Sequence, residues 1–213
     1  MKLSAEQIEK IDTILEKLGL DFLDFKLEIK DHIASQTEDL CNERNFSFEE
    51  VLPLVLKEWE SNLQQKTSIW ISNKRSFSTV VLNGIKKRYL IYNSIATPII
   101  VIFFLLHFLY RKETETNYWY QIMFSIGTIL FLTLSVFRYL IFKMRKVTSY
   151  SYEFNRIYKM VAIFWLFDMV FYFSSGISPV DLWKAMIVTY MPIAIYSYYK
   201  HNQFCKRFKK FIV

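Results

Sequence analysis

The stretch YLIYNSIATPIIVIFFLLHFLY, residues 89–110, decides the fold of this chain because it contains no Asp, Glu, Lys or Arg over 22 residues. As an α-helix such a stretch is about 33 Å long, and the hydrocarbon core of a bilayer is about 30 Å thick. A buried helix in a soluble protein of this size rarely needs that length. The stretch therefore predicts a transmembrane helix.

Further apolar stretches follow it along the chain. We expect additional membrane spans over residues 117–140, 157–175 and 179–199. The last of these begins with Asp181 and Lys184 and then continues for 15 uncharged residues. The second half of the chain thus predicts a four-helix transmembrane bundle, 89–199, followed by a basic tail.

The distribution of Lys and Arg predicts the orientation of these spans. Sixteen of them flank the spans on one side, and three lie on the other. Because basic residues are retained in the cytoplasm, we expect a multi-pass protein of the cell inner membrane with both termini cytoplasmic. The amino terminus, MKLSAEQIEKID, is charged and amphipathic, so we expect no cleavable signal peptide.

Composition separates the two halves of the 213-residue chain. Residues 1–88 carry 13 Lys and Arg against 15 Asp and Glu, whereas residues 89–213 carry 14 against 5. Only four Gly and four Pro occur, and hydrophobic residues make up 53%. This composition excludes collagen-like and low-complexity disordered proteins. The two cysteines, Cys41 and Cys205, cannot form a disulfide framework.

The first half shows the periodicity of amphipathic helices, and we expect an all-α cytoplasmic three-helix domain over residues 1–65. Apolar residues recur at helical spacing over residues 4–18 and about 21–42, and a third helix begins at Ser47. For residues 66–88 we expect an interfacial amphipathic helix or linker, with a fourth bundle helix as the alternative. Capping boxes are expected at the first and third helix starts, and a charged face on the second; the residues are Ser4 with Gln7, Ser47 with Glu50, and Asp24, Glu28, Asp31 and Glu38.

The second helix reads DFLDFKLEIKDHI over residues 21–33, and the third opens with SFEE, residues 47–50. This layout resembles the HAAS-type bacterial signalling domain, in which short cytoplasmic helices with an acidic-x-x-acidic-His segment precede transmembrane helices. The resemblance covers residues 1–65. It implies a regulatory role at the membrane and a protein partner, with Glu28, Asp31 and His32 on the cytoplasmic interaction surface.

Two polar residues lie inside the predicted spans. Asp168 is placed in the apolar sequence FWLFDMVFYF, where a charged carboxylate costs about 2.5–3.5 kcal/mol by insertion scales. It is interpreted as an interhelical hydrogen-bonding group or as a proton or ion site. A third interpretation is that the span is displaced, so that the Asp168 side chain contacts water. Its candidate partners are Ser125, Thr128, Thr133 and Tyr190. His107, near the outer end of the first span, is interpreted as an interfacial histidine.

The basic tail, residues 200–213, alternates cationic and aromatic side chains and is expected to lie on anionic lipid headgroups. Its cations are Lys206, Arg207, Lys209 and Lys210, and each contributes about 1 kcal/mol near such a surface. His201 is expected to be solvated there. We expect no nucleic-acid partner.

The chain contains none of the common catalytic, phosphate-binding or metal-binding motifs. His32 with two carboxylates on one helix does not make a metal site, which needs three or four converging ligands. We therefore predict no catalytic residues, metal or cofactor, and an enzyme is the less favoured class. The sequence favours a regulatory, sensory or scaffolding protein. Alternatives are a small oligomeric transporter or channel using Asp168, or an accessory subunit of a larger membrane complex; a homo-oligomer is possible.

Overall fold

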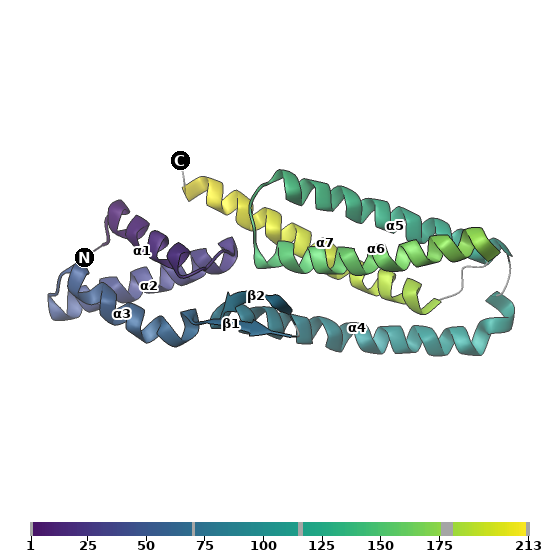
Figure 1. Cartoon of the computed structure of the whole chain (residues 1–213), viewed down its shortest axis with the longest axis horizontal. Helices are drawn as coiled ribbons and strands as arrows, with labels where there is room; N and C mark the ends of the chain where they lie inside the picture. Colours follow the sequence, from purple (N-terminus) through teal and green to yellow (C-terminus); the bar gives the residue numbers. More distant parts are fainter. Residues whose placement is uncertain (1, 70, 115–116, 176–180, 212–213) are drawn as a thin grey trace. The chain divides into compact units, whose positions relative to one another are not determined.

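A computed structural model describes residues 2–69, 71–114, 117–175 and 181–211 (Figure 1). Within these residues the chain forms seven α-helices and one two-stranded antiparallel sheet, so it is almost entirely helical. The chain divides into two compact units. Unit 1 comprises Met1–Arg88 with Val147–Ser149, and unit 2 comprises Tyr89–Lys146 with Tyr150–Val213.

Unit 1 contains the three predicted amphipathic helices: α1 (Ala5–Lys17), α2 (Leu23–Arg44) and α3 (Phe48–Leu63). Both predicted capping boxes are confirmed, with Ser4 and Gln7 at α1 and Ser47 and Glu50 at α3. A helix as short as the 13-residue α1 is marginal in water on its own. Packing around a shared apolar core therefore stabilises the three helices. The fully buried side chains of this core include Ile11, Leu15, Phe22, Ile33, Val51 and Val55.

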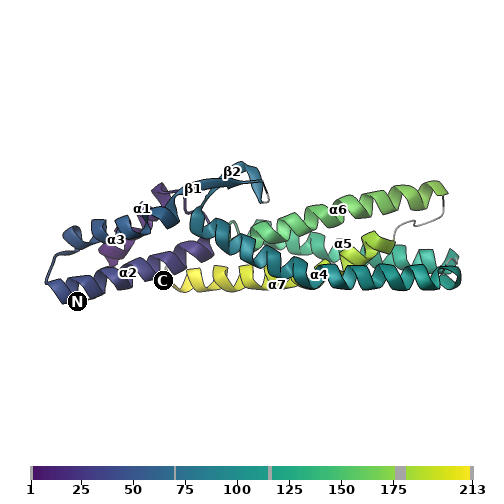
Figure 2. The same cartoon turned by 90° about the horizontal axis from the view of Figure 1, so that it is seen from below.

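The prediction of an amphipathic helix over residues 66–88 is wrong for its first part. Strands β1 (Gln65–Ser68) and β2 (Ser72–Ser78) form an antiparallel hairpin, and helix α4 begins only at Thr79 (Figure 2). The apolar residues that suggested one helix belong in part to β2 and in part to the first turns of α4.

Two features of the hairpin explain the difference. Its frequent serines bond readily to nearby backbone and so disfavour helix. Phe77 of β2 is buried against the Phe22 ring, 5.6 Å between centroids, a contact to a residue 55 positions earlier in the chain. Arg75 covers both rings and forms an ion pair with Asp21 at 2.8 Å. The hairpin is therefore held by tertiary contacts that a local pattern does not contain.

The remaining helices are α4 (Thr79–Thr114), α5 (Asn117–Lys143), α6 (Ser149–Ser175) and α7 (Asp181–Phe211). Three of them are long and apolar enough to cross a membrane among the described residues. The apolar segments are Thr79–Leu106, Phe124–Lys143 and Ser149–Ser174, with mean hydropathy of 2.0, 1.8 and 1.5. They correspond to the first three predicted spans, whereas α7 is not among them.

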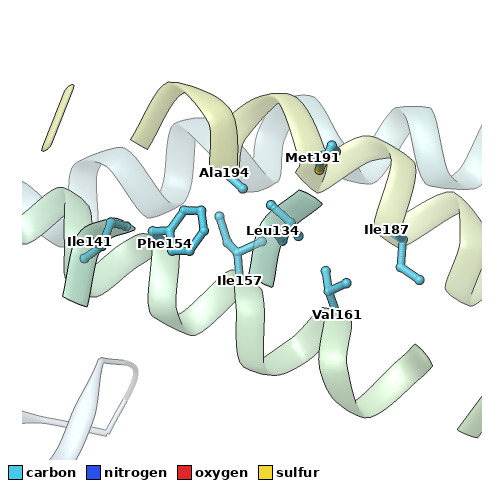
Figure 3. Close-up of a cluster of buried hydrophobic side chains, with 8 residues drawn as sticks. All are labelled: Leu134, Ile141, Phe154, Ile157, Val161, Ile187, Met191 and Ala194. Atoms are coloured by element: carbon cyan, nitrogen blue, oxygen red, sulfur yellow. The ribbon is translucent and has the colours of Figure 1, made fainter. Parts of the chain in front are cut away.

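Unit 2 has a core shared by α5, α6 and α7 (Figure 3). It contains Leu134 and Ile141 of α5, Phe154, Ile157 and Val161 of α6, and Ile187, Met191 and Ala194 of α7. Large apolar side chains also cover the outside of the unit; the Phe142 side chain, for example, is 80% exposed. Such extensive apolar exposure is typical of a surface that meets lipid or another protein.

Candidate functional site

A polar cluster in unit 1 joins three segments that are distant in the sequence, and we name it the clasp: Asp24, Arg88 and Ser149. The Asp24 carboxylate is only 4% exposed and accepts hydrogen bonds from the Ser149 backbone N–H, at 2.8 Å, and from the Ser149 hydroxyl. The Ser149 hydroxyl oxygen accepts from Arg88 Nη2 at 2.6 Å. The clasp thus connects α2, α4 and the segment Val147–Ser149.

The clasp satisfies the open ends of two helices. The first N–H groups of a helix have no partner within it, and carboxylates near a helix start are favourable. Phe22, at the N-cap of α2, supplies no side-chain hydrogen bond, and the Leu23 N–H instead donates to the Val147 carbonyl at 3.0 Å. In return, Asp24 accepts from Ser149, the first residue of α6. Each of the two helix starts therefore has a backbone N–H that bonds to the other segment.

The third side of the clasp is built on a close helix approach. The Arg88 guanidinium lies over the Phe25 ring, 5.6 Å from its centroid. The same ring lies against Gly84 of α4, where a Cβ atom would be 2.4 Å from Phe25 Cζ. Only glycine leaves the Phe25 ring in this position, and the ring supports the Arg88 side chain.

Asp24 itself was expected on the charged outer face of its helix, and this prediction is wrong. The helical spacing does place it beside exposed residues, but the Val147–Ser149 segment covers it. Its position in the first turn of α2 indicated a possible role at a helix start, because an acid there commonly accepts from unsatisfied N–H groups.

The predicted interaction surface, Glu28, Asp31 and His32, is exposed on α2. The structure adds an aromatic neighbour from α3, because the His32 ring stacks with Trp59 at 6.3 Å between centroids. The Trp59 indole N–H donates to Gln36 Oε1 at 2.7 Å. An exposed acidic stretch beside a half-buried Trp is a suitable protein-binding surface, and binding there stays a prediction.

An ionic network joins α1 to α2. The buried Lys26 Nζ lies 2.9 Å from Asp12 and 2.7 Å from Glu16, and Lys30 contacts Asp12 at 2.9 Å. Burial by itself raises the pKa of Asp12 and lowers that of Lys26. The hydrogen bonds and charges of the network outweigh burial, so the pKa of Asp12 is lowered and that of Lys26 is raised. Both groups therefore stay ionised at neutral pH.

In unit 2, Asp168 of α6 is 8% exposed, so the interpretation that its side chain contacts water is wrong. Lys184 of α7 is also buried, at 6% exposed. The four predicted partner hydroxyls of Asp168 direct their hydrogen bonds elsewhere among the described residues. Ser125, Thr128 and Thr133 donate to the carbonyls of Gln121, Phe124 and Ile129, and Tyr190 donates to Asn93 Oδ1 at 2.6 Å.

The proton of each hydroxyl is therefore used elsewhere, and the pairing of Asp168 with these residues stays a prediction. A Ser or Thr within a helix readily donates to the carbonyl four residues earlier, and this local bond uses the only hydroxyl proton. The side chain of His107 lies outside the described residues.

The expected basic tail is the last part of α7, which continues as helix to Phe211. Lys206 and Arg207 are exposed, as lipid contact requires, and the side chains of Lys209 and Lys210 lie outside the described residues. His201, however, is fully buried, and its Nε2 lies 3.7 Å from Cys205 Sγ. Burial lowers the pKa of His201 to about 4. The expectation of a solvated His201 is wrong because the helix keeps packing beyond residue 199.

No group of three or more His, Cys, Asp or Glu side chains that could hold a metal ion occurs in the described part of the chain. Comparisons with protein-family models, with curated proteins and with solved structures find no match to this chain.

Proposed function

We propose that the chain is a multi-pass inner-membrane protein whose amino-terminal unit is a cytoplasmic interaction module with a regulatory, sensory or scaffolding role. The three apolar helices support the membrane assignment. The excess of Lys and Arg on one side of the spans supports cytoplasmic termini. The resemblance of residues 1–65 to a HAAS-type domain adds that the module binds a protein partner through Glu28, Asp31 and His32.

The packing of α7 supports a fourth span. This helix contributes three residues to the core of unit 2, and its Tyr198 ring stacks on Phe137 of α5 at 4.4 Å. Further along, Lys146 lies over the ring of Phe208. Residue numbers therefore increase together along α5 and α7, so the two helices run parallel. A helix packed lengthwise beside a membrane-spanning α5 lies at the same depth, and Lys184, a charged residue in the first turn of α7, is buried.

The clasp is the observation that carries the regulatory role. The chain passes between the units after residues 88, 146 and 149. Helices α4 and α6 therefore contain the clasp residues Arg88 and Ser149, and α5 leads into the segment Val147–Ser149. A shift of any of these helices in the membrane therefore acts on Arg88, Val147 or Ser149. A passive anchor needs one such connection, whereas a sensor needs its module to respond to the spans.

The test is site-specific photo-crosslinking in cells with the full chain. A benzophenone amino acid replaces the exposed His32, and in a matched control it replaces Thr13, which is exposed on α1. We expect a discrete adduct with a cytosolic protein from position 32 and not from position 13. The same adducts from both positions, or none from either, would contradict the proposal.

A second arm tests the coupling. Asp24→Ala removes the acceptor of the clasp, and Asp39→Ala removes an exposed acid of the same helix. The adduct yield at position 32 should change at least twofold with Asp24→Ala and stay unchanged with Asp39→Ala. Equal yields in the two variants would leave the module as a scaffold without regulation by the spans.

The burial of Asp168 and Lys184 favours a second candidate function, a small oligomeric transporter or channel. Ionisable residues buried in membrane helices often mark an ion or proton pathway. The test is a proton-flux assay with the full chain in liposomes, comparing the wild type with Asp168→Asn, which cannot ionise. Flux that Asp168→Asn abolishes would support this function, and no flux from the wild type would exclude it.

A further inference from the structure

An apolar groove runs between α5 and α7 on the outside of unit 2. Its volume is about 550 Å³, and it is lined by Leu130 of α5 and by residues of α7 that include Val188, Pro192, Ile195, Tyr196 and Tyr199. Apart from Met191, the lining residues of α7 are exposed; Tyr199, for example, is 61% exposed. A molecule outside unit 2 can therefore contact the groove directly.

The length of the groove matches one leaflet of a bilayer. From Val188 to Tyr199 the helix rises by about 17 Å, and half of a hydrocarbon core of about 30 Å is about 15 Å. An extended acyl chain from a single leaflet therefore fits along it. Pro192 lies in the middle of this path and cannot donate a backbone hydrogen bond to Val188, which allows α7 to bend there.

The two ends of the groove differ in polarity. Tyr196 and Tyr199 lie at one end, and tyrosine is favoured at the headgroup depth of a membrane. The Lys200 ammonium lies over the Tyr196 ring, 5.8 Å from its centroid. Lys206 and Arg207 follow and are exposed. An apolar path that ends at tyrosines and then at cations is complementary to an anionic lipid.

We propose that this groove is a binding site for an anionic phospholipid, with one acyl chain against Leu130 and Ile195 and the phosphate at Lys200. The proposal rests on the proposed function, because it requires α7 to lie in the membrane. It predicts that the lipid comes from the leaflet on the side of Lys200, where anionic lipids are concentrated if that side is cytoplasmic.

Native mass spectrometry of the full chain in mild detergent tests the site, with phosphatidylglycerol and phosphatidylcholine of identical acyl chains as probes. We expect the wild type to bind phosphatidylglycerol more tightly. Ile195→Trp fills the groove and should weaken binding of both lipids several-fold. Leu132→Trp, at an exposed α5 position outside the groove lining, is its control and should have no effect.

The charge is tested separately. Lys200→Gln should lower the preference for phosphatidylglycerol about fivefold, as expected for one basic residue near an anionic surface. Lys159→Gln, which removes an exposed lysine of α6, should leave the preference unchanged. Equal binding of the two lipids by the wild type, or equal effects of the two members of either variant pair, would overturn the proposal. A change from dimer to monomer in Ile195→Trp, without loss of lipid, would assign the groove to a second copy of the chain instead.

Failure of the proposed function is distinguishable from failure of the lipid site. If the chain is released from membranes by alkaline carbonate, the membrane assignment itself is wrong. If it stays in the membrane but shows no lipid preference, only the lipid site is wrong.

Discussion

Asp24 stabilises unit 1 by accepting two hydrogen bonds from one buried serine. In Asp24→Ala the N–H and hydroxyl of Ser149 lose this acceptor, and each such loss costs about 1–3 kcal/mol when the donor is buried. We expect the free energy of unfolding of unit 1 to fall by about 2 kcal/mol. The measurement is labelling of the buried Cys41 by a thiol-reactive dye during heating, in a Cys205→Ala background.

The matched control for this prediction is Asp39→Ala. Asp39 is exposed on the same helix, and exposed substitutions usually change stability by less than about 0.5 kcal/mol. If Cys41 becomes reactive at the same temperature in both variants, the clasp does not stabilise unit 1.

Because His201 is buried, we expect the free energy of unfolding of unit 2 to fall in acid. The pKa of His201 is about 4 in the folded chain and 6.5 ordinarily, because burial disfavours the charged ring. The unfolded chain therefore binds a proton at higher pH than the folded chain, and stability falls as the pH decreases from 6.5 towards 4. The pKa difference corresponds to at most about 3 kcal/mol.

The measurement for His201 is the pH dependence of Cys205 labelling on heating, in a Cys41→Ala background. His201→Gln cannot gain this proton and should flatten the pH dependence between 6.5 and 4. Other ionisable groups of unit 2, among them Glu153, contribute equally in both chains, so the difference reports His201. Identical pH profiles for His201→Gln and the wild type would contradict the prediction.

Among the elements, α4 depends on one glycine where it meets α2. In Gly84→Ala the new methyl group displaces the Phe25 ring and its contact with Arg88, at a cost of about 1–3 kcal/mol. The gain in helix propensity offsets about 1 kcal/mol of this. We expect unit 1 to lose about 1 kcal/mol, measured by Cys41 labelling.

Gly127 of α5 is the matched control for Gly84. Apart from its chain neighbours and the nearby backbone of its own helix, no atom lies within 4 Å of a Cβ placed there. Gly127→Ala should therefore retain the propensity gain and stabilise unit 2 by up to about 1 kcal/mol. The measurement is Cys205 labelling. Destabilisation by Gly127→Ala as large as that by Gly84→Ala would show that the close approach of Phe25 is not the cause.

For the whole molecule, four spans predict that both termini lie on the same side of the membrane. Single cysteines are introduced at Ser4, Glu113 and Arg207 in a chain without Cys41 and Cys205. In spheroplasts, a membrane-impermeant maleimide should label only the position 113 variant, at the carboxyl end of α4. Labelling at position 207 with protection at position 4 would mean that α7 does not cross and that the chain has three spans.

Local patterns in the sequence sufficed for the starts of α1 and α3 and for the apolar helices. The Ser4 and Ser47 capping boxes involve residues three positions apart, and apolar length is a property of one segment. Such features depend on neighbours in the chain, so they are readable without a structure. Of the candidate site, the exposure of Glu28, Asp31 and His32 was predictable for the same reason, since it follows from helical periodicity.

The hairpin, the clasp and the burial of His201 could not be predicted in this way. Asp24 and Ser149 are 125 residues apart, and neither has a local pattern that indicates the other. The carbonyl acceptors of the three α5 hydroxyls could not be predicted either, because the sequence does not show which polar groups bond within their own helix.

The sequence by itself determined that this chain has amphipathic helices followed by helices long and apolar enough for a membrane, because periodicity and length are local properties. Only the tertiary structure decided that residues 65–78 form strands, that Asp24 and His201 are buried, and that Val147–Ser149 belongs to the amino-terminal unit. The physical reason is that burial and hydrogen-bond partners depend on which distant segments meet, and the energy of each contact exists only after they do.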